Sequence, residues 1–185
     1  MMALDWFQKK SGKKTAVPEA APHAPAAFTD GVYIGKLLSE DLIVRLPAGK
    51  SKEQLIHILI EKLCKVRKLG DPAPYYKKVL EREQGMSTTL DTGLAVPHAR
   101  IDGMETMSAV LGILPQGIPD PKQPDLVIRA MCIFFSPNRQ EVFTQHLHLL
   151  RGVSALFQPA FIDELLKKAS ASEMLQMIAQ REQAG

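Results

Sequence analysis

The chain has 185 residues, 45% of them hydrophobic, which suffices for one well-buried domain with additional segments. Its 23 basic and 20 acidic residues give a net charge of +3 and are mixed along the chain, so the composition does not indicate nucleic-acid binding. No apolar run approaches the roughly 18 residues that a stable membrane span needs. Because Cys64 and Cys132 stand singly in apolar stretches, we expect buried thiols in a cytoplasmic protein.

A change in composition near Asp30 divides the chain into two parts. Residues 1–30 contain four lysines and an Ala/Pro-rich stretch, a composition that cannot bury enough apolar surface to offset the entropy of ordering. We therefore predict a flexible leader over residues 1–30, in which His23 is solvated, and a folded domain over residues 31–182.

The first half of this domain reads as an extended segment followed by two helices. Residues 42–46 favour a strand, and residues 51–54 have the spacing of a capping box ahead of an apolar stripe that stops near Gly70. His57 points away from that stripe and is expected at the surface. Pro74 begins a second helix that ends before Gly85 and carries Arg82 near its end.

The second half alternates strands and helices. Strands are predicted at residues 94–96, 110–114 and 126–135, and the last is almost wholly apolar, as a central strand covered on both faces would be. Helical spacing then returns over residues 138–157, 161–168 and 173–180. This order predicts an α/β fold, a three-layer α/β/α sandwich with a central mixed β-sheet flanked by helices.

His98 is the residue that most needs a chemical explanation. It follows Pro97 where an apolar run ends, so a stiff backbone presents the imidazole at the expected end of a strand. A histidine offers at neutral pH an uncharged ring nitrogen that can attack an electrophile or exchange a proton. His98 is therefore a candidate nucleophile.

Two further histidines, His146 and His148, share the helix predicted over residues 138–157. Residues two apart on a helix face opposite sides, so only one of them can face the sheet. His146 shares its side with Phe143, Leu150 and Val153 and is the inward candidate, either as a catalytic group or as a hydrogen-bonded structural residue.

Other site chemistries have less support. The opposed phases of His146 and His148 argue against metal chelation, and neither a His-Glu-x-x-His motif nor an acidic or cysteine cluster completes a ligand set. The sequence also lacks a Gly-x-Ser-x-Gly elbow and a glycine-rich phosphate loop. We therefore expect no cofactor and no metal.

Four segments together resemble a known family. Residues 51–55, 82–88, 94–100 and 146–150 occur in the order found in the type-2 IIA domain of the bacterial phosphoenolpyruvate-dependent phosphotransferase system (PTS). That family includes fructose- and mannitol-type IIA components and the nitrogen-regulatory IIA protein. The combination of Arg-Glu-x-Gly-x-Ser-Thr with Ala-Val-Pro-His-Ala is specific, and the resemblance covers residues 31 to about 180.

The resemblance implies roles for individual residues. His98 would accept a phosphoryl group from a histidine of an HPr-type phosphocarrier protein, with His146 as the second active-site histidine and Arg82 as the active-site arginine. Thr88 and Thr89 are further candidates as hydroxyl donors to the phosphoryl group. A protonated His146 and Arg82 would stabilise the dianion, although a structural role for Arg82, pairing with Glu83 or capping its helix, stays open.

Three functions remain in view. The chain is expected to be a free-standing regulatory module of the nitrogen type, whose phosphorylation changes its contacts with a target protein. The alternative is a sugar-specific subunit that relays phosphate to a IIB domain during uptake. In either case it acts as a carrier or regulator rather than a stand-alone enzyme. A metal-dependent hydrolase that uses the histidines as ligands is the third.

Overall fold

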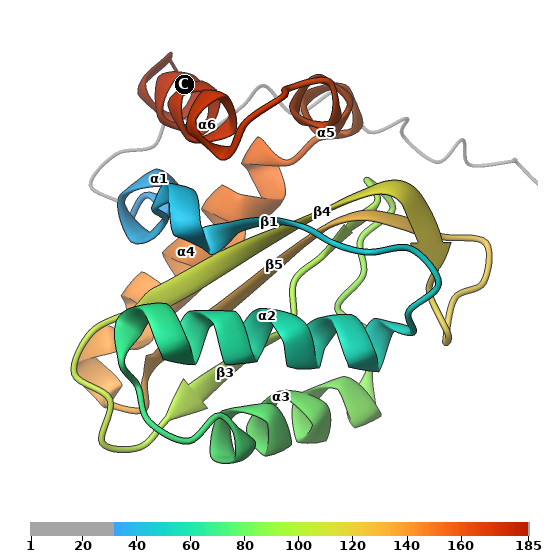
Figure 1. The fold of residues 1–185 in the computed structure, drawn as a ribbon. Coiled ribbons are helices and arrows are strands. Elements are labelled where there is room, and N and C mark those ends of the chain that lie inside the picture. Colours follow the sequence, from blue (N-terminus) through green and yellow to red (C-terminus); the bar gives the residue numbers. More distant parts are fainter. Residues whose placement is uncertain (1–31, 185) are drawn as a thin grey trace, which may run out of the picture.

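The computed structural model describes residues 32–184 (Figure 1). The predicted leader, including His23, lies outside these residues. The folded part is built on one mixed five-stranded sheet with helices on both faces, which confirms the predicted sandwich.

The sheet runs in the order β1, β4, β5 and β2, with β3 also paired to β5. β4 and β5 are long antiparallel partners, whereas β1 is parallel to β4, and β2 and β3 are parallel to β5. The strands span Ile43–Arg45 (β1), Leu94–Ala95 (β2), His98–Ile101 (β3), Ser108–Pro119 (β4) and Val127–Pro137 (β5). As predicted, β5 is buried along most of its length, because it lies between neighbours and under helices.

β2 and β3 follow one another along the same side of β5. Leu94 pairs with Ala130 and His98 pairs with Phe134, so Val96 and Pro97 form a short interruption between two collinear pieces. Proline has no N–H to give to a ladder, which explains the break at this point. The expectation that His98 ends a strand is wrong: it begins the next one.

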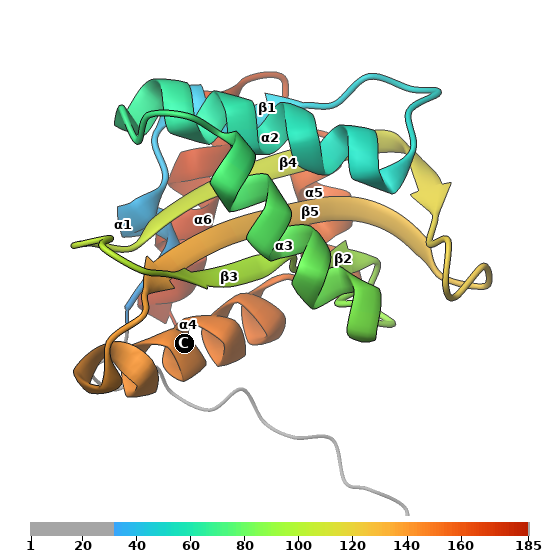
Figure 2. The ribbon, with the colours of Figure 1, turned by 90° about the horizontal axis from the view of Figure 1, so that it is seen from below.

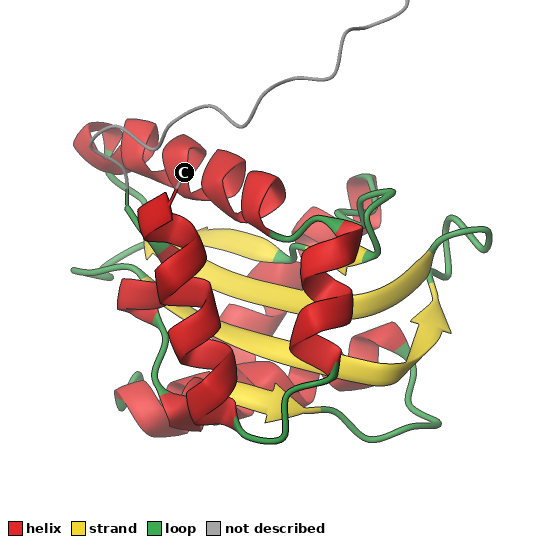
Figure 3. Ribbon diagram, turned by 90° about the horizontal axis from the view of Figure 1, so that it is seen from above, coloured by secondary structure: helices red, strands yellow, loops and turns green. Residues whose placement is uncertain are grey.

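The helices form the outer layers, α2 and α3 on one face of the sheet and α5 and α6 on the other (Figures 1 and 3). α4 lies beside β3 (Figure 2). The helices span Ile34–Leu37 (α1), Lys52–Arg67 (α2), Ala73–Gly85 (α3), Phe143–Leu156 (α4), Pro159–Leu166 (α5) and Ala171–Ala184 (α6), with single 3₁₀ turns at Glu40–Leu42 and Gln140–Val142.

The predicted start of α2 is confirmed by its hydrogen bonds. The Ser51 hydroxyl accepts from the Gln54 N–H at 3.3 Å, and the Gln54 side chain accepts from the Ser51 N–H at 3.0 Å, so the capping box is complete. The helix ends at Arg67 and is capped by Lys68, whose φ of 54° is left-handed, two residues before the predicted stop at Gly70.

The buried stripe of α4 is rotated from the predicted one. Phe143 was expected on the inner side but is 39% exposed, as Leu147 is 47% exposed, whereas Leu149 and Leu156 are buried with His146. The helix lies at the edge of the sheet, beside β3, and so buries only a narrow stripe. The prediction that His146 faces inward is nevertheless confirmed.

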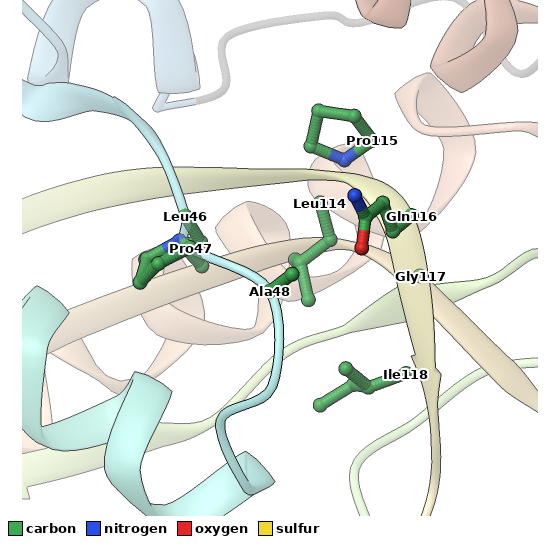
Figure 4. Close-up of a pocket in the computed structure, with 8 residues that line it drawn as sticks. All are labelled: Leu46, Pro47, Ala48, Leu114, Pro115, Gln116, Gly117 and Ile118. Atoms are coloured by element: carbon green, nitrogen blue, oxygen red, sulfur yellow. The ribbon is translucent and has the colours of Figure 1, made fainter.

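Both cysteines, Cys64 and Cys132, are free and buried, as predicted. Within residues 32–184, no helix has the length and apolar character needed to cross a membrane. A shallow, mainly apolar groove opens between residues 46–48, which follow β1, and residues 114–118, where the pairing of β4 with β5 is irregular (Figure 4). None of the residues that line this groove is a site residue predicted from the sequence.

Candidate functional site

The imidazole of His98 is held by its own strand and by the strand beside it. Its Nδ1 lies 2.7 Å from the carbonyl oxygen of Val96, and its ring stacks on Phe134 of β5 at 5.4 Å between centroids and 11° between planes. The side chain is partly buried. These contacts fix the ring without covering it completely.

The hydrogen bond to Val96 determines which ring nitrogen of His98 is nucleophilic. A carbonyl oxygen can only accept, so Nδ1 carries the proton and donates it. In the neutral imidazole the other nitrogen, Nε2, then keeps its lone pair. The sequence alone left this choice open.

His146 comes from α4 and completes an aromatic cluster with His98. Its ring centroid lies 5.4 Å from that of His98 and 5.2 Å from that of Phe134. Its Nδ1 lies 2.7 Å from the buried hydroxyl of Ser136. When Ser136 donates in this contact, Nε2 of His146 carries the proton and becomes a donor. His148 on the same helix is exposed, as expected from its phase.

Both clustered imidazoles favour their neutral forms. Burial lowers the pKa of His98; the hydrogen bond to Val96 opposes this effect, and the charges of Arg82 and Glu83 lower and raise the pKa, respectively. Burial lowers the pKa of His146 to about 4, helped by repulsion from His98 and Arg100. A lowered pKa favours the neutral form of His146 at neutral pH in the protein without a phosphoryl group.

Arg82 lies on the last turn of α3 with an exposed side chain. Its Nη1 donates to the carbonyl of Met86 at 3.2 Å, the residue that caps α3, and its charge acts on the pKa of His98. The capping contact that the sequence left open is thus present. The carboxylate of Glu83 pairs instead with Lys52 at 2.7 Å.

Thr88 and Thr89 lie in the segment between α3 and β2, and both are buried. The hydroxyl of Thr88 donates to Glu83, and that of Thr89 donates to Asp120 at 2.6 Å. Both hydroxyls are thus engaged by carboxylates in this structure, and either would have to turn to reach a group on His98.

Sequence reasoning did not identify the partners of the two histidines. Phe134 and Ser136 are two residues apart on β5 and therefore lie on the same face of the strand. This spacing could have indicated a shared face, but the sequence does not reveal the register of β5 against β3. Arg100 was also missed. It lies two residues after His98 on β3, and its guanidinium packs over the Phe143 ring at 5.0 Å.

No group of three or more histidine, cysteine or acidic side chains is placed to hold a metal ion within the part of the chain that is described. The candidate site brings together the imidazoles of His98 and His146 and the backbone carbonyl of Val96, with Arg82 close enough for its charge to act on the pKa of His98.

The model of the family "Phosphoenolpyruvate-dependent sugar phosphotransferase system, EIIA 2" matches residues 36–181. The chain belongs to this family. The match includes all of the candidate site residues, so the family resemblance of the sequence segments is confirmed.

Curated relatives fall into two groups within this PTS family. A nitrogen regulatory protein of Pseudomonas aeruginosa is 26% identical over 140 residues, which cover 74% of this chain and 86% of the relative. The fructose-specific EIIABC component of Bacillus subtilis is 27% identical over 145 residues, which cover 77% of this chain and 22% of the relative. The chain thus spans about a fifth of the EIIABC protein.

Solved structures show the same fold. The nitrogen regulatory protein IIA-Ntr of Neisseria meningitidis has a TM-score of 0.70 at 24% identity, covering 78% of this chain and 98% of that one. The IIA mannitol protein of Escherichia coli has a TM-score of 0.60 at 23% identity, covering 76% and 98%. A structure of mannitol IIA in complex with phosphorylated IIB, also from Escherichia coli, has a TM-score of 0.61 at 22% identity, covering 77% and 97%.

Proposed function

We propose that this protein is a phosphohistidine carrier of the PTS that accepts a phosphoryl group on Nε2 of His98 from a histidine of an HPr-type phosphocarrier. The observation that carries the proposal is the hydrogen bond between His98 Nδ1 and Val96, since it leaves Nε2 as an oriented nucleophile beside a second imidazole. Access to the phosphocarrier requires that the protein work in the cytoplasm.

The transfer step needs only groups present on the two proteins. The lone pair of Nε2 attacks phosphorus in line with the phosphorus–nitrogen bond of the donor, and the electron pair of that bond returns to the donor imidazole. The positive charge that develops on the His98 ring is stabilised by the Val96 carbonyl at Nδ1. Neither an outside oxidant nor a covalent intermediate other than phosphohistidine is involved.

The product brings about two negative charges into the site. Arg82 supplies a charge-assisted hydrogen bond, and the dianion favours protonation of His146 by attraction, which reverses the preference of the free protein for neutral imidazole. Each such bond is worth ~1.5–3 kcal/mol where water is excluded. Thr88 and Thr89 remain candidates for a similar role once their hydroxyls turn.

The regulatory, nitrogen-type role is favoured over sugar transport. Among the three solved structures compared, nitrogen-regulatory IIA-Ntr has the highest TM-score, 0.70 against 0.60 and 0.61 for the two mannitol IIA structures. We infer that the phosphorylated state is read by a regulatory target protein. The alternative is a sugar-specific IIA subunit that passes the group to a IIB domain, the partner found with mannitol IIA.

The experiment is incubation with phosphoenolpyruvate, enzyme I and each of the two phosphocarriers, HPr and its nitrogen-branch counterpart, followed by mass mapping of the modified residue. We expect acid-labile label on His98, no label in His98→Ala, and normal labelling of His148→Ala, an exposed histidine on α4. Faster labelling by the nitrogen-branch carrier supports regulation, and faster labelling by HPr supports transport. Label retained in His98→Ala contradicts the proposal.

A further inference from the structure

A buried ionic cluster lies around the ammonium of Lys52, the first residue of α2. Nζ of Lys52 contacts a carboxylate oxygen of Glu83 at 2.7 Å and one of Asp120 at 2.9 Å, and donates to the hydroxyls of Ser87 at 3.0 Å and Thr89 at 3.1 Å. The Lys52 side chain is 5% exposed and that of Asp120 is fully buried. One cation is thus shared among four oxygens, two from carboxylates and two from hydroxyls.

Stability alone does not explain such a cluster. Removing an ion from water costs several kcal/mol, and well-packed apolar side chains of similar size often replace a buried ion pair without loss. The pKa of Asp120 lies well below its ordinary range: burial raises it, but hydrogen bonds from Lys52, Thr89 and Ser87 outweigh that effect. The groups of the cluster therefore stay charged. We look for its role in the chain segments that it holds together.

One branch of the cluster holds the last turn of α3. Glu83 is the neighbour of Arg82 on that turn, and its carboxylate is fixed by Lys52 and by the hydroxyl of Thr88. The ammonium of Lys122 donates to the carbonyl of Glu83 and, at 2.8 Å, to that of Gln84. The backbone that carries Arg82 is thus tied to the start of α2 and to the β4–β5 loop.

A second branch reaches the strand that orients His98. The carbonyl of Thr88 accepts from the N–H of Val96 at 3.1 Å, and the carbonyl of Val96 in turn accepts from His98 Nδ1. Glu83 is therefore linked through Thr88 and Val96 to the imidazole, and through the helix backbone to Arg82, whose charge acts on the pKa of His98.

We propose that Glu83, anchored by Lys52, is a positioning residue for phosphoryl transfer: it fixes the last turn of α3, and with it the guanidinium of Arg82, relative to the imidazole of His98. This inference rests on the proposed function. Transfer through a loose transition state depends on the placement of charge, so loss of the anchor lowers the turnover number rather than the affinity for the donor.

The test compares Glu83→Gln with Glu81→Gln, alone and in an Arg82→Lys background. Glu83→Gln keeps the size of the side chain but loses its charge, whereas Glu81→Gln removes an exposed charge from the same helix and is the matched control. The readouts are kcat and KM for transfer from the phosphorylated carrier and amide hydrogen exchange over residues 82–86.

We expect Glu83→Gln to lower kcat about tenfold with KM for the carrier changed less than about twofold, and to speed amide exchange in the last turn of α3. Glu81→Gln is expected to change neither. In the Arg82→Lys background, Glu83→Gln is expected to lower kcat far less than it does in the wild-type background, because both changes remove the same placed charge. If Glu83→Gln does not fold, Thr88→Val, which removes one hydrogen bond to Glu83, enters the same cycle.

The positioning role is overturned if the losses of kcat in the two single variants multiply in the double variant. It is also overturned if Glu83→Gln leaves amide exchange unchanged. An equal loss in Glu81→Gln overturns it as well, because the effect is then one of net charge. If the wild-type protein takes no label on His98, the proposed function fails. If the wild-type protein is labelled but the effects of the two substitutions on kcat are independent, only the positioning role is refuted.

Discussion

The Nδ1–H of His98 donates to the carbonyl of Val96, two residues earlier in the chain, at 2.7 Å. Pro97, between them, restricts φ and pushes Val96 toward extended backbone. The hydrogen bond that orients the ring is thus built into three consecutive residues, and stacking on Phe134 of β5 adds to it. This local arrangement leaves the lone pair of Nε2 free.

The phosphoryl group is therefore expected on Nε2 of His98. ¹⁵N NMR of the labelled imidazole, before and after phosphorylation, distinguishes the two ring nitrogens directly. We expect a protonated Nδ1 in the free protein and a phosphorus coupling to Nε2 in the modified one. A phosphoryl group on Nδ1 would contradict the hydrogen bond to Val96 as the determinant of reactivity.

His146 is expected to make the fold sensitive to acid. Its pKa is about 4 in the folded protein against 6.5 ordinarily, so between these values the unfolded chain binds a proton that the native state does not. Stability is then fully present above pH 6.5 and is lost as the pH falls toward 4. At about 1.4 kcal/mol per pKa unit, the loss is about 3 kcal/mol, and the lowered pKa of His98 adds to it.

Chemical denaturation at a series of pH values measures this effect. His146→Asn keeps an amide near the position of Nδ1, within reach of Ser136, but cannot titrate, so its unfolding free energy is expected to fall less between pH 6.5 and 4. His148→Asn, on the exposed side of α4, controls for the helix propensity of asparagine. An unchanged pH profile in His146→Asn would show that another group carries the acid sensitivity.

The sequence predicted the two histidines of the site but not what surrounds them. The helical period alone separates His146 from His148, and this argument held although the predicted stripe was right only in part, with Val153 buried and Phe143 exposed. β3 was missed because four residues, His-Ala-Arg-Ile, show no apolar alternation. Its pairing with β5 is a tertiary property.

The ionic cluster lay beyond sequence reasoning for a different reason. Lysine is rarely buried, so Lys52 read as an ordinary residue in the first turn of α2. Its partner Asp120 is 68 residues away, on the β4–β5 loop. Only the fold brings Lys52 and Asp120 together, since the two residues share no local motif.

Gly112→Ala is expected to destabilise the fold. A Cβ atom at Gly112 on β4 would lie 2.5 Å from Leu46 Cδ1 and 2.9 Å from Leu59 Cδ1, both in the core between the sheet and α2. Overpacking of this kind costs about 1–3 kcal/mol. Gly85→Ala, where a Cβ would meet nothing within 4 Å, is the control and is expected to leave the unfolding free energy unchanged or slightly higher. Equal stability of both variants would contradict the tight packing at Gly112.

The docking surface for the phosphocarrier is expected to include the exposed apolar side of α4. Phe143 and Leu147 lie one helical turn apart on either side of His146 in the sequence, and the Phe143 ring carries the guanidinium of Arg100. Exposed apolar side chains beside cationic groups are typical of sites that bind another protein. Leu147→Glu is therefore expected to raise KM for the carrier about tenfold with little change in kcat.

Val127→Glu provides the matched control for this substitution. Val127 is 48% exposed, as Leu147 is 47%, but it begins β5, whereas His98 pairs with Phe134, roughly 20 Å further along that strand. An acidic group at Val127 adds the same charge without entering the docking surface, so its KM should match that of the wild-type protein. Equal increases in KM for the two variants would mean that net charge, rather than contact with α4, controls the encounter.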